Sequence, residues 1–142
     1  MTAMKKINFF TAALVCGFFV SGCAHIKEVP KIMWGSSTKD LEGARWQGAF
    51  KTFQGSLSDC FDKVLSIAQE EKMTVFMSDK KKGFIDLMGV AGSLNTTEVG
   101  IFLSEPEQGK TKLEVVSTSH QAQFTAAEIL FSNFAKTFSE VK

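Results

Sequence analysis

The sequence lacks tyrosine altogether and has only two prolines, two histidines and three cysteines in 142 residues. Few prolines and 22% charged residues exclude a disordered tail, since such tails are rich in both. An excess of charge of one sign is also missing, because 16 Lys and Arg face 15 Asp and Glu. A nucleic-acid partner requires a basic surface that follows the phosphates, so none is expected. A chain of this length forms one domain at most.

What the sequence does have is a basic start followed by an uncharged apolar run. Lys5 and Lys6 precede residues 7–20, which carry no charged side chain. This run is shorter than the roughly 20 apolar residues that a membrane-spanning helix needs. Its layout is typical of a secretory signal. Residues 1–22 are therefore predicted to be an export signal that is removed from the mature protein.

Residues 20–23, Val-Ser-Gly-Cys, resemble the lipobox of bacterial lipoproteins. The resemblance implies that the thiol of Cys23 is lipidated and that the chain is then cut between Gly22 and Cys23. Cys16 lies in the middle of the apolar run and lacks the small preceding residue that the cleavage point requires. The alternative is an ordinary signal peptide that is cut near Gly22 or Ala24, with Cys23 incidental.

By the same resemblance, Cys23 becomes the mature N-terminus and carries a diacylglyceryl thioether, usually with a third acyl chain on its amine. Two chains give stable anchoring, because each buried methylene contributes about 0.8 kcal/mol. Residue 24 is Ala and not Asp, which resembles the pattern of Gram-negative lipoproteins exported to the outer membrane. We expect an exported, membrane-anchored protein, on the periplasmic face of the outer membrane if the host is Gram-negative.

The predicted mature chain is close to neutral and has a single free thiol. Loss of Lys5 and Lys6 leaves 14 basic and 15 acidic side chains. Cys16 is discarded and Cys23 is acylated, so Cys60 stands alone and no intrachain disulfide can form. Stability must therefore come from the burial of a core.

Residues 23–45 are interpreted as the lipidated N-terminus and tether. Gly-Ser-Ser at 35–37 is a breaker cluster. The sequence over 37–40 has the form of a capping box, which predicts a short helix to about Ala44. Fully extended, residues 24–45 would reach on the order of 70 Å. Residues 46–142 are predicted to form a single domain.

Hydrophobic periodicity divides this domain into strands and helices. The expected order is a strand over 46–54, a helix that begins after the Ser56 cap, strands over 73–78, 84–90, 97–104 and 111–118 with turns at 79–83 and 105–110, and a final helix with a stripe of Phe124, Ala127, Phe131, Phe134, Phe138 and Val141. Strands joined by short turns form an antiparallel sheet. The prediction is an α+β two-layer sandwich of order β-α-β-β-β-β-α, with about five strands and two helices on one face. In element order alone it resembles the helix-grip domains of envelope lipoproteins, and no functional residue is carried over.

No catalytic or metal-binding constellation stands out. His25 belongs to the tether, and His120 precedes the last helix, where capping explains it. Asp79 and Asp86 are a pair of carboxylates, but Asp79 begins a turn and Asp86 is expected on the exposed side of a strand. Cys60 lies on an apolar helix stripe and is interpreted as a core residue. We expect no catalytic residue, no metal and no cofactor.

The most unusual stretch of the domain is the apolar, glycine-rich segment 87–95 between two strands. One interpretation is a flexible loop with Leu94 packed on the sheet edge. The other is a mobile apolar loop that docks on a partner or covers a groove, since exposed apolar surface commonly marks an interaction site. The candidate partner- or ligand-binding residues are Met88, Val90, Leu94, Phe102 and Phe131.

Three functions stay open at this point. The leading hypothesis is a non-enzymatic envelope lipoprotein whose domain binds a protein or another envelope component. The second is a carrier that holds a lipid or another apolar ligand between the C-terminal helix and the sheet. The third is an envelope hydrolase, which is supported only by the expected location. The lipobox, the long tether and the lack of a catalytic constellation favour the first.

Overall fold

The computed structural model describes residues 38–142, which form one compact unit. The predicted lipidation site at Cys23 and the cleavage site after Gly22 lie outside the described residues. The unit includes residues 38–45, so the predicted boundary between tether and domain at 45 and 46 is wrong. Residues 38–43 are helical and are called the 38–43 helix below. The remaining elements are η1 (Arg45–Gln47), β1 (Ala49–Gln54), α3 (Leu57–Glu70), β2 (Thr74–Asp79), β3 (Phe84–Met88), β4 (Val99–Glu107), β5 (Lys110–Val116) and α4 (His120–Ala135).

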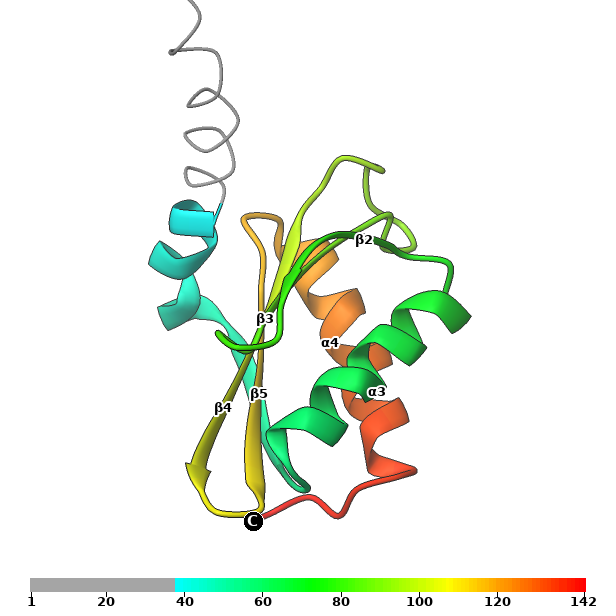
Figure 1. Cartoon of the computed structure of the whole chain (residues 1–142). Coiled ribbons are helices and arrows are strands. Elements are labelled where there is room, and N and C mark those ends of the chain that lie inside the picture. The colour runs from blue at the N-terminus through cyan, green and yellow to red at the C-terminus, as the bar shows by residue number, and fades with distance from the viewer. Residues whose placement is uncertain (1–37) are drawn as a thin grey trace, which may run out of the picture. The chain divides into compact units, whose positions relative to one another are not determined.

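All five strands form one antiparallel sheet in the order β1-β5-β4-β3-β2. Helices α3 and α4 cover one face of this sheet, and the 38–43 helix lies on the opposite face (Figure 1). The predicted α+β fold and its element order are confirmed. The short helix that the capping box at 37–40 predicts is also confirmed, but it packs on the sheet and is not part of a tether. Among the described residues, no helix is long and apolar enough to cross a membrane.

The main core fills the layer between the sheet and the two long helices. α3 begins where the Ser56 hydroxyl accepts a hydrogen bond of 3.1 Å from the Asp59 amide, which confirms the predicted cap. Phe53 of β1 packs against Phe134 of α4 with ring centroids 5.1 Å apart. The fully buried side chains of this core include Phe53, Val64, Ile67, Ile85, Leu87, Ile101, Leu113, Leu130 and Phe134.

The buried face of α4 differs from the predicted stripe. Phe124 is 68% exposed, so its assignment to the core is wrong. Ala122 and Ala126 are fully buried instead, because small side chains let the helix approach the sheet closely. The helix ends at Ala135, and the chain then pairs with β1 through a bridge at Glu140.

Several strand boundaries also differ from the prediction, most at the start of β1 and at the end of β4. β1 does not include Trp46, because hydrogen bonds from Gln47 N to Ala44 O and from Gly48 N to Arg45 O close a 3-10 turn there. β4 continues to Glu107, so the predicted turn over 105–110 is reduced to residues 108 and 109. Its register shifts between Ser104 and Glu107, where Pro106 has no amide hydrogen to donate.

Candidate functional site

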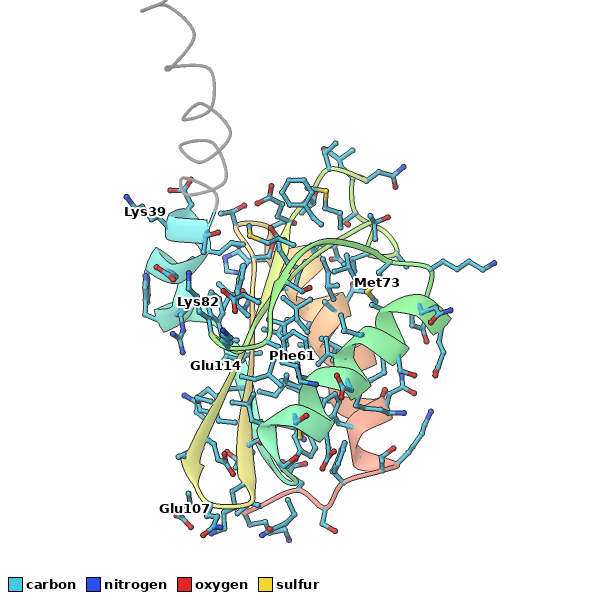
Figure 2. All side chains as sticks on the ribbon, in the orientation of Figure 1. Lys39, Phe61, Met73, Lys82, Glu107 and Glu114 are labelled. Atoms are coloured by element: carbon cyan, nitrogen blue, oxygen red, sulfur yellow. The ribbon has the colours of Figure 1, made fainter. Side chains whose placement is uncertain are left out.

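The face of the sheet that points away from α3 and α4 is called the far face. The register places Phe50, Glu114, Phe102 and Phe84 in one row across four strands of this face. Figure 2 shows Glu114 and Lys82 on the side of the sheet that carries the 38–43 helix. The far face is therefore covered in part by this helix and carries charged side chains beside aromatic ones.

A second, smaller core fixes the 38–43 helix to the far face. Leu41 of this helix is buried with Phe84, Phe102 and Val116. The two phenylalanine rings lie 4.9 Å apart between centroids. A Cβ atom at Gly100 would lie 3.2 Å from the Leu41 Cδ1 atom, so glycine permits the close approach of the helix.

A cavity of about 170 Å³ lies at the edge of this small core. Phe84 and Phe102 contribute its aromatic lining. Its volume is below the roughly 300–1,000 Å³ of pockets for drug-sized ligands, so it has room for a group the size of one side chain. The full lining consists of Thr38, Glu42, Arg45, Met77, Asp79, Lys82, Phe84 and Phe102, which includes two acidic and two basic side chains.

The carboxylate of Glu114 holds two cations over two aromatic rings. It accepts hydrogen bonds from Arg45 Nη2 and from Lys112 Nζ, the latter at 3.1 Å. The Arg45 guanidinium lies 4.5 Å from the centroid of Phe102, and Lys112 Nζ lies 4.3 Å from that of Phe50. Arg45 therefore lies at the cavity. Aromatic and charged side chains alternate across the far face from the cavity to β1.

The turn beside the cavity is organised by Asp79. Its Oδ1 atom accepts hydrogen bonds from the amides of Lys81 and Lys82, at 3.0 and 3.2 Å. This confirms that Asp79 begins the turn. The Lys82 side chain is 81% exposed and lies 3.8 Å from Asp79 Oδ2, so its ammonium group remains accessible at the rim of the cavity.

Asp86 is completely buried, and the prediction that it lies on an exposed side of a strand is wrong. It lies on the far face beside Gly100, its register partner, where Leu41 packs. Neither carboxylate oxygen has a hydrogen-bond partner among the described residues. Burial, and then the nearby charge of Glu98, raises the pKa of Asp86 to about 7. Burial and the charge of Asp40 also raise the pKa of Glu98.

The structure does not bring the five predicted binding residues together. Phe102 lines the cavity, and Val90 belongs to the main core. Leu94 is 76% exposed, so the prediction that it packs on the sheet edge is wrong. Met88 is half-buried at the end of β3. Phe131 is half-buried beside Phe53, with ring centroids 6.4 Å apart, in the helix layer.

The structure gives no catalytic or metal-binding arrangement to the other residues that the sequence offers for such roles, within residues 38–142. Ser119 caps α4 by accepting a hydrogen bond from the Ala122 amide at 3.4 Å. His120 is the exposed first residue of that helix, so the expectation that it caps the helix is wrong. Cys60 is fully buried, as predicted, and burial raises the pKa of its thiol. Within residues 38–142, no group of three or more His, Cys, Asp or Glu could hold a metal ion.

Sequence reasoning missed Arg45 and Glu42, because both were assigned to the tether. The signal that could have found them is the capping box at 37–40, since a helix so close to the domain can pack against it. No known protein family matches the chain, and no curated protein matches it.

Proposed function

We propose that this chain is an envelope lipoprotein, anchored to a membrane through lipid on Cys23, whose domain binds a partner protein and has no catalytic role. The anchoring rests on the lipobox-like residues 20–23 after an apolar run. The binding role rests on the far-face cavity, where an aromatic pair lies among charged groups of both signs. Such small, partly apolar pockets receive the anchor residues of protein interfaces.

The cavity favours a basic side chain on the partner. The Phe84 and Phe102 rings suit the aliphatic part of a lysine or arginine, although the Arg45 guanidinium already lies over Phe102. Arg45 is already paired with Glu114. Glu42 is exposed at the cavity, and no ion pair to it occurs among the described residues. The carboxylate of Glu42 is therefore the group that a partner cation would approach.

Two observations favour this proposal over the alternatives. The layer between α4 and the sheet, where a carrier would hold its ligand, is filled by Phe53, Leu130 and Phe134, all fully buried. For a hydrolase, Asp86 is inaccessible to a substrate and is not part of the cavity lining. His120 does not line that cavity either.

The anchoring is tested in the native host. Globomycin, which inhibits the lipoprotein signal peptidase, should cause the precursor to accumulate. A Cys23→Ala variant should no longer fractionate with membranes. Unchanged precursor size under globomycin, or a Cys23→Ala variant that stays with the membrane, would overturn the anchoring.

The binding role is tested by site-specific photocrosslinking of the lipidated full chain in its own envelope. A photoreactive residue in place of Lys82, at the rim of the cavity, should give a discrete protein adduct. The same residue in place of Gln108, in the β4–β5 turn, is the matched control and should give none. Glu42→Lys should abolish the adduct, whereas Glu128→Lys on the exposed side of α4 should preserve it. No adduct at position 82, or one that survives Glu42→Lys, contradicts the proposal.

A further inference from the structure

The three most exposed large apolar side chains of residues 38–142 are Trp46, Leu94 and Phe124. Their exposed fractions are 82%, 76% and 68%. They come from three different segments, η1, the β3–β4 connection and the second turn of α4. None of the three contributes to the cores described above, so folding of the described unit does not account for them.

The strand register places all three segments at one end of the sheet. Trp46 precedes Ala49, which pairs with Val115 near the end of β5. The segment that contains Leu94 joins β3 to β4, whose residue Gly100 pairs with Val116. α4 starts shortly after Val116. This end of the domain, marked by Trp46, Leu94 and Phe124, is called the apolar end below.

The opposite end of the domain has a different chemistry. The β4–β5 hairpin there exposes Glu105, Pro106, Glu107 and Gln108. Figure 2 shows Lys39, next to the first described residue, towards one end and Glu107 at the other. The chain that leads back to Cys23 therefore enters the domain away from its polar hairpin.

Buried polar contacts hold the segments of the apolar end together. The Gln123 side chain donates to the Gln47 carbonyl at 2.8 Å and accepts from the Ser117 amide at 3.0 Å. The Ser117 hydroxyl donates to the Glu98 carbonyl at 2.7 Å. These bonds connect η1, α4, the β5–α4 connection and the end of the β3–β4 connection. The three apolar side chains thus project from a framework that is already ordered, which lowers the entropic cost of binding.

We propose that the apolar end contacts the lipid surface to which Cys23 anchors the chain. This rests on the proposed lipid anchor. Fourteen residues, 24–37, separate the lipidated cysteine from the described unit, and they reach at most about 50 Å. The domain is thereby held at high effective concentration beside the bilayer. Tryptophan, phenylalanine and leucine are the side chains that insert at the membrane interface.

The experiment uses the lipidated mature chain in phosphatidylcholine vesicles, with and without brominated acyl chains that quench tryptophan emission. Trp34→Phe leaves Trp46 as the only tryptophan. The matched control adds Trp46→Phe and Gln108→Trp, which moves the reporter to the polar hairpin. We expect brominated lipid to cause a loss of emission at position 46 and none at position 108.

Flotation of the vesicles separates the two ways in which the experiment can fail. Protein that does not float with vesicles overturns the lipid anchor of the proposed function. Protein that floats but keeps its emission at position 46 overturns the inference and leaves the anchor standing. Equal loss at positions 46 and 108 also overturns it, because the domain then has no preferred orientation.

A second set of variants tests the role of the other two side chains. Leu94→Asn with Phe124→Asn changes only exposed positions, so the fold should be kept, as circular dichroism would verify. In the Trp34→Phe background we expect this pair to reduce the quenching of Trp46. The control pair Gln108→Asn with Glu128→Gln should leave it unchanged. If the substitutions at Leu94 and Phe124 leave the quenching of Trp46 unchanged, the whole apolar end does not contact the lipid.

Discussion

The side-chain amide of Gln123 and the main-chain carbonyl of Gln47 are joined by a hydrogen bond of 2.8 Å, although they lie 76 positions apart in the chain. The oxygen of the same amide accepts a hydrogen bond from the Ser117 amide. Gln123 is only 9% exposed. One buried side chain therefore fixes η1 and the β5–α4 connection relative to each other.

Gln123→Ala should lower the free energy of unfolding by about 2–3 kcal/mol, because it leaves the buried Ser117 amide and the partly buried Gln47 carbonyl without their partner. Urea denaturation monitored by circular dichroism measures the loss. Gln121→Ala is the control, since Gln121 is exposed and bonds only to Thr125 among the described residues; it should cost less than about 0.5 kcal/mol. Equal losses in the two variants would show that the Gln123 contacts contribute little.

The buried carboxyl of Asp86 should make stability depend on pH. Its pKa is about 7 in the folded chain, against 3.8 for the ordinary group. Between these values the folded state binds the extra proton, so the contribution of Asp86 to stability is present at low pH and is lost as pH rises to about 7. Over the whole range this amounts to on the order of 4 kcal/mol.

Asp86→Asn removes this titration. Its effect should therefore be more favourable at pH 8 than at pH 5, by about 3 kcal/mol in the free energy of unfolding. Urea denaturation at the two pH values is the measurement. Glu128→Gln, at an exposed position of α4, should show the pH dependence of the unmodified protein. If Asp86→Asn keeps the pH dependence of the unmodified protein, the Asp86 carboxyl is not neutral in the folded state.

The pair of Arg45 and Glu114 should stabilise the protein more than an exposed ion pair does. The Glu114 side chain is only 9% exposed, so the contact is shielded from water on one side. A double-mutant cycle with Arg45→Ala and Glu114→Ala should give a coupling free energy of about 1–1.5 kcal/mol. The same cycle on Lys51 and Glu140, whose side chains are 40% and 42% exposed, should give less than about 0.5 kcal/mol. A larger coupling free energy for Lys51 and Glu140 than for Arg45 and Glu114 would refute this prediction.

Gly83 should tolerate no side chain. Its φ is +63°, and a Cβ atom there would lie 2.2 Å from the Leu103 carbonyl oxygen. Gly83→Ala should cost more than about 3 kcal/mol in thermal or urea unfolding, since a backbone clash adds to the strain of the left-handed conformation. Gly92 has φ +78° but open space around it, so Gly92→Ala should cost about 1–2 kcal/mol. Similar losses of stability at both positions would mean that the left-handed backbone conformation, and not the clash with Leu103, causes the loss.

Part of the fold could be predicted because its signals are local. Ser56 and Asp59 lie three residues apart and form the cap of α3 whatever the rest of the chain does. Asp79 organises its own turn through the amides that follow it. Alternating apolar residues in β4 and β5 likewise place Ile101 and Leu113 in the core. Caps, turns and periodicity involve neighbours in the sequence, so the chain itself displays them.

The candidate site could not be predicted in the same way. Helical spacing predicts Phe124 on the buried stripe of α4, yet Ala122 and Ala126 are the fully buried residues there. Arg45 and Glu114 are 69 positions apart, and no local pattern pairs them. Asp86 is buried because Leu41, far away in the sequence, packs on the same face. Each of these facts depends on which segments meet in space.

The sequence by itself determined the near balance of charge, a single thiol in the described unit, the order of strands and helices, and the α+β class, because composition and periodicity are properties of the chain. The tertiary structure alone decided that the 38–43 helix covers the far face, that Asp86 is enclosed there, and that Trp46, Leu94 and Phe124 share one exposed end. Burial and pairing of this kind arise only when strands distant in sequence align in one sheet.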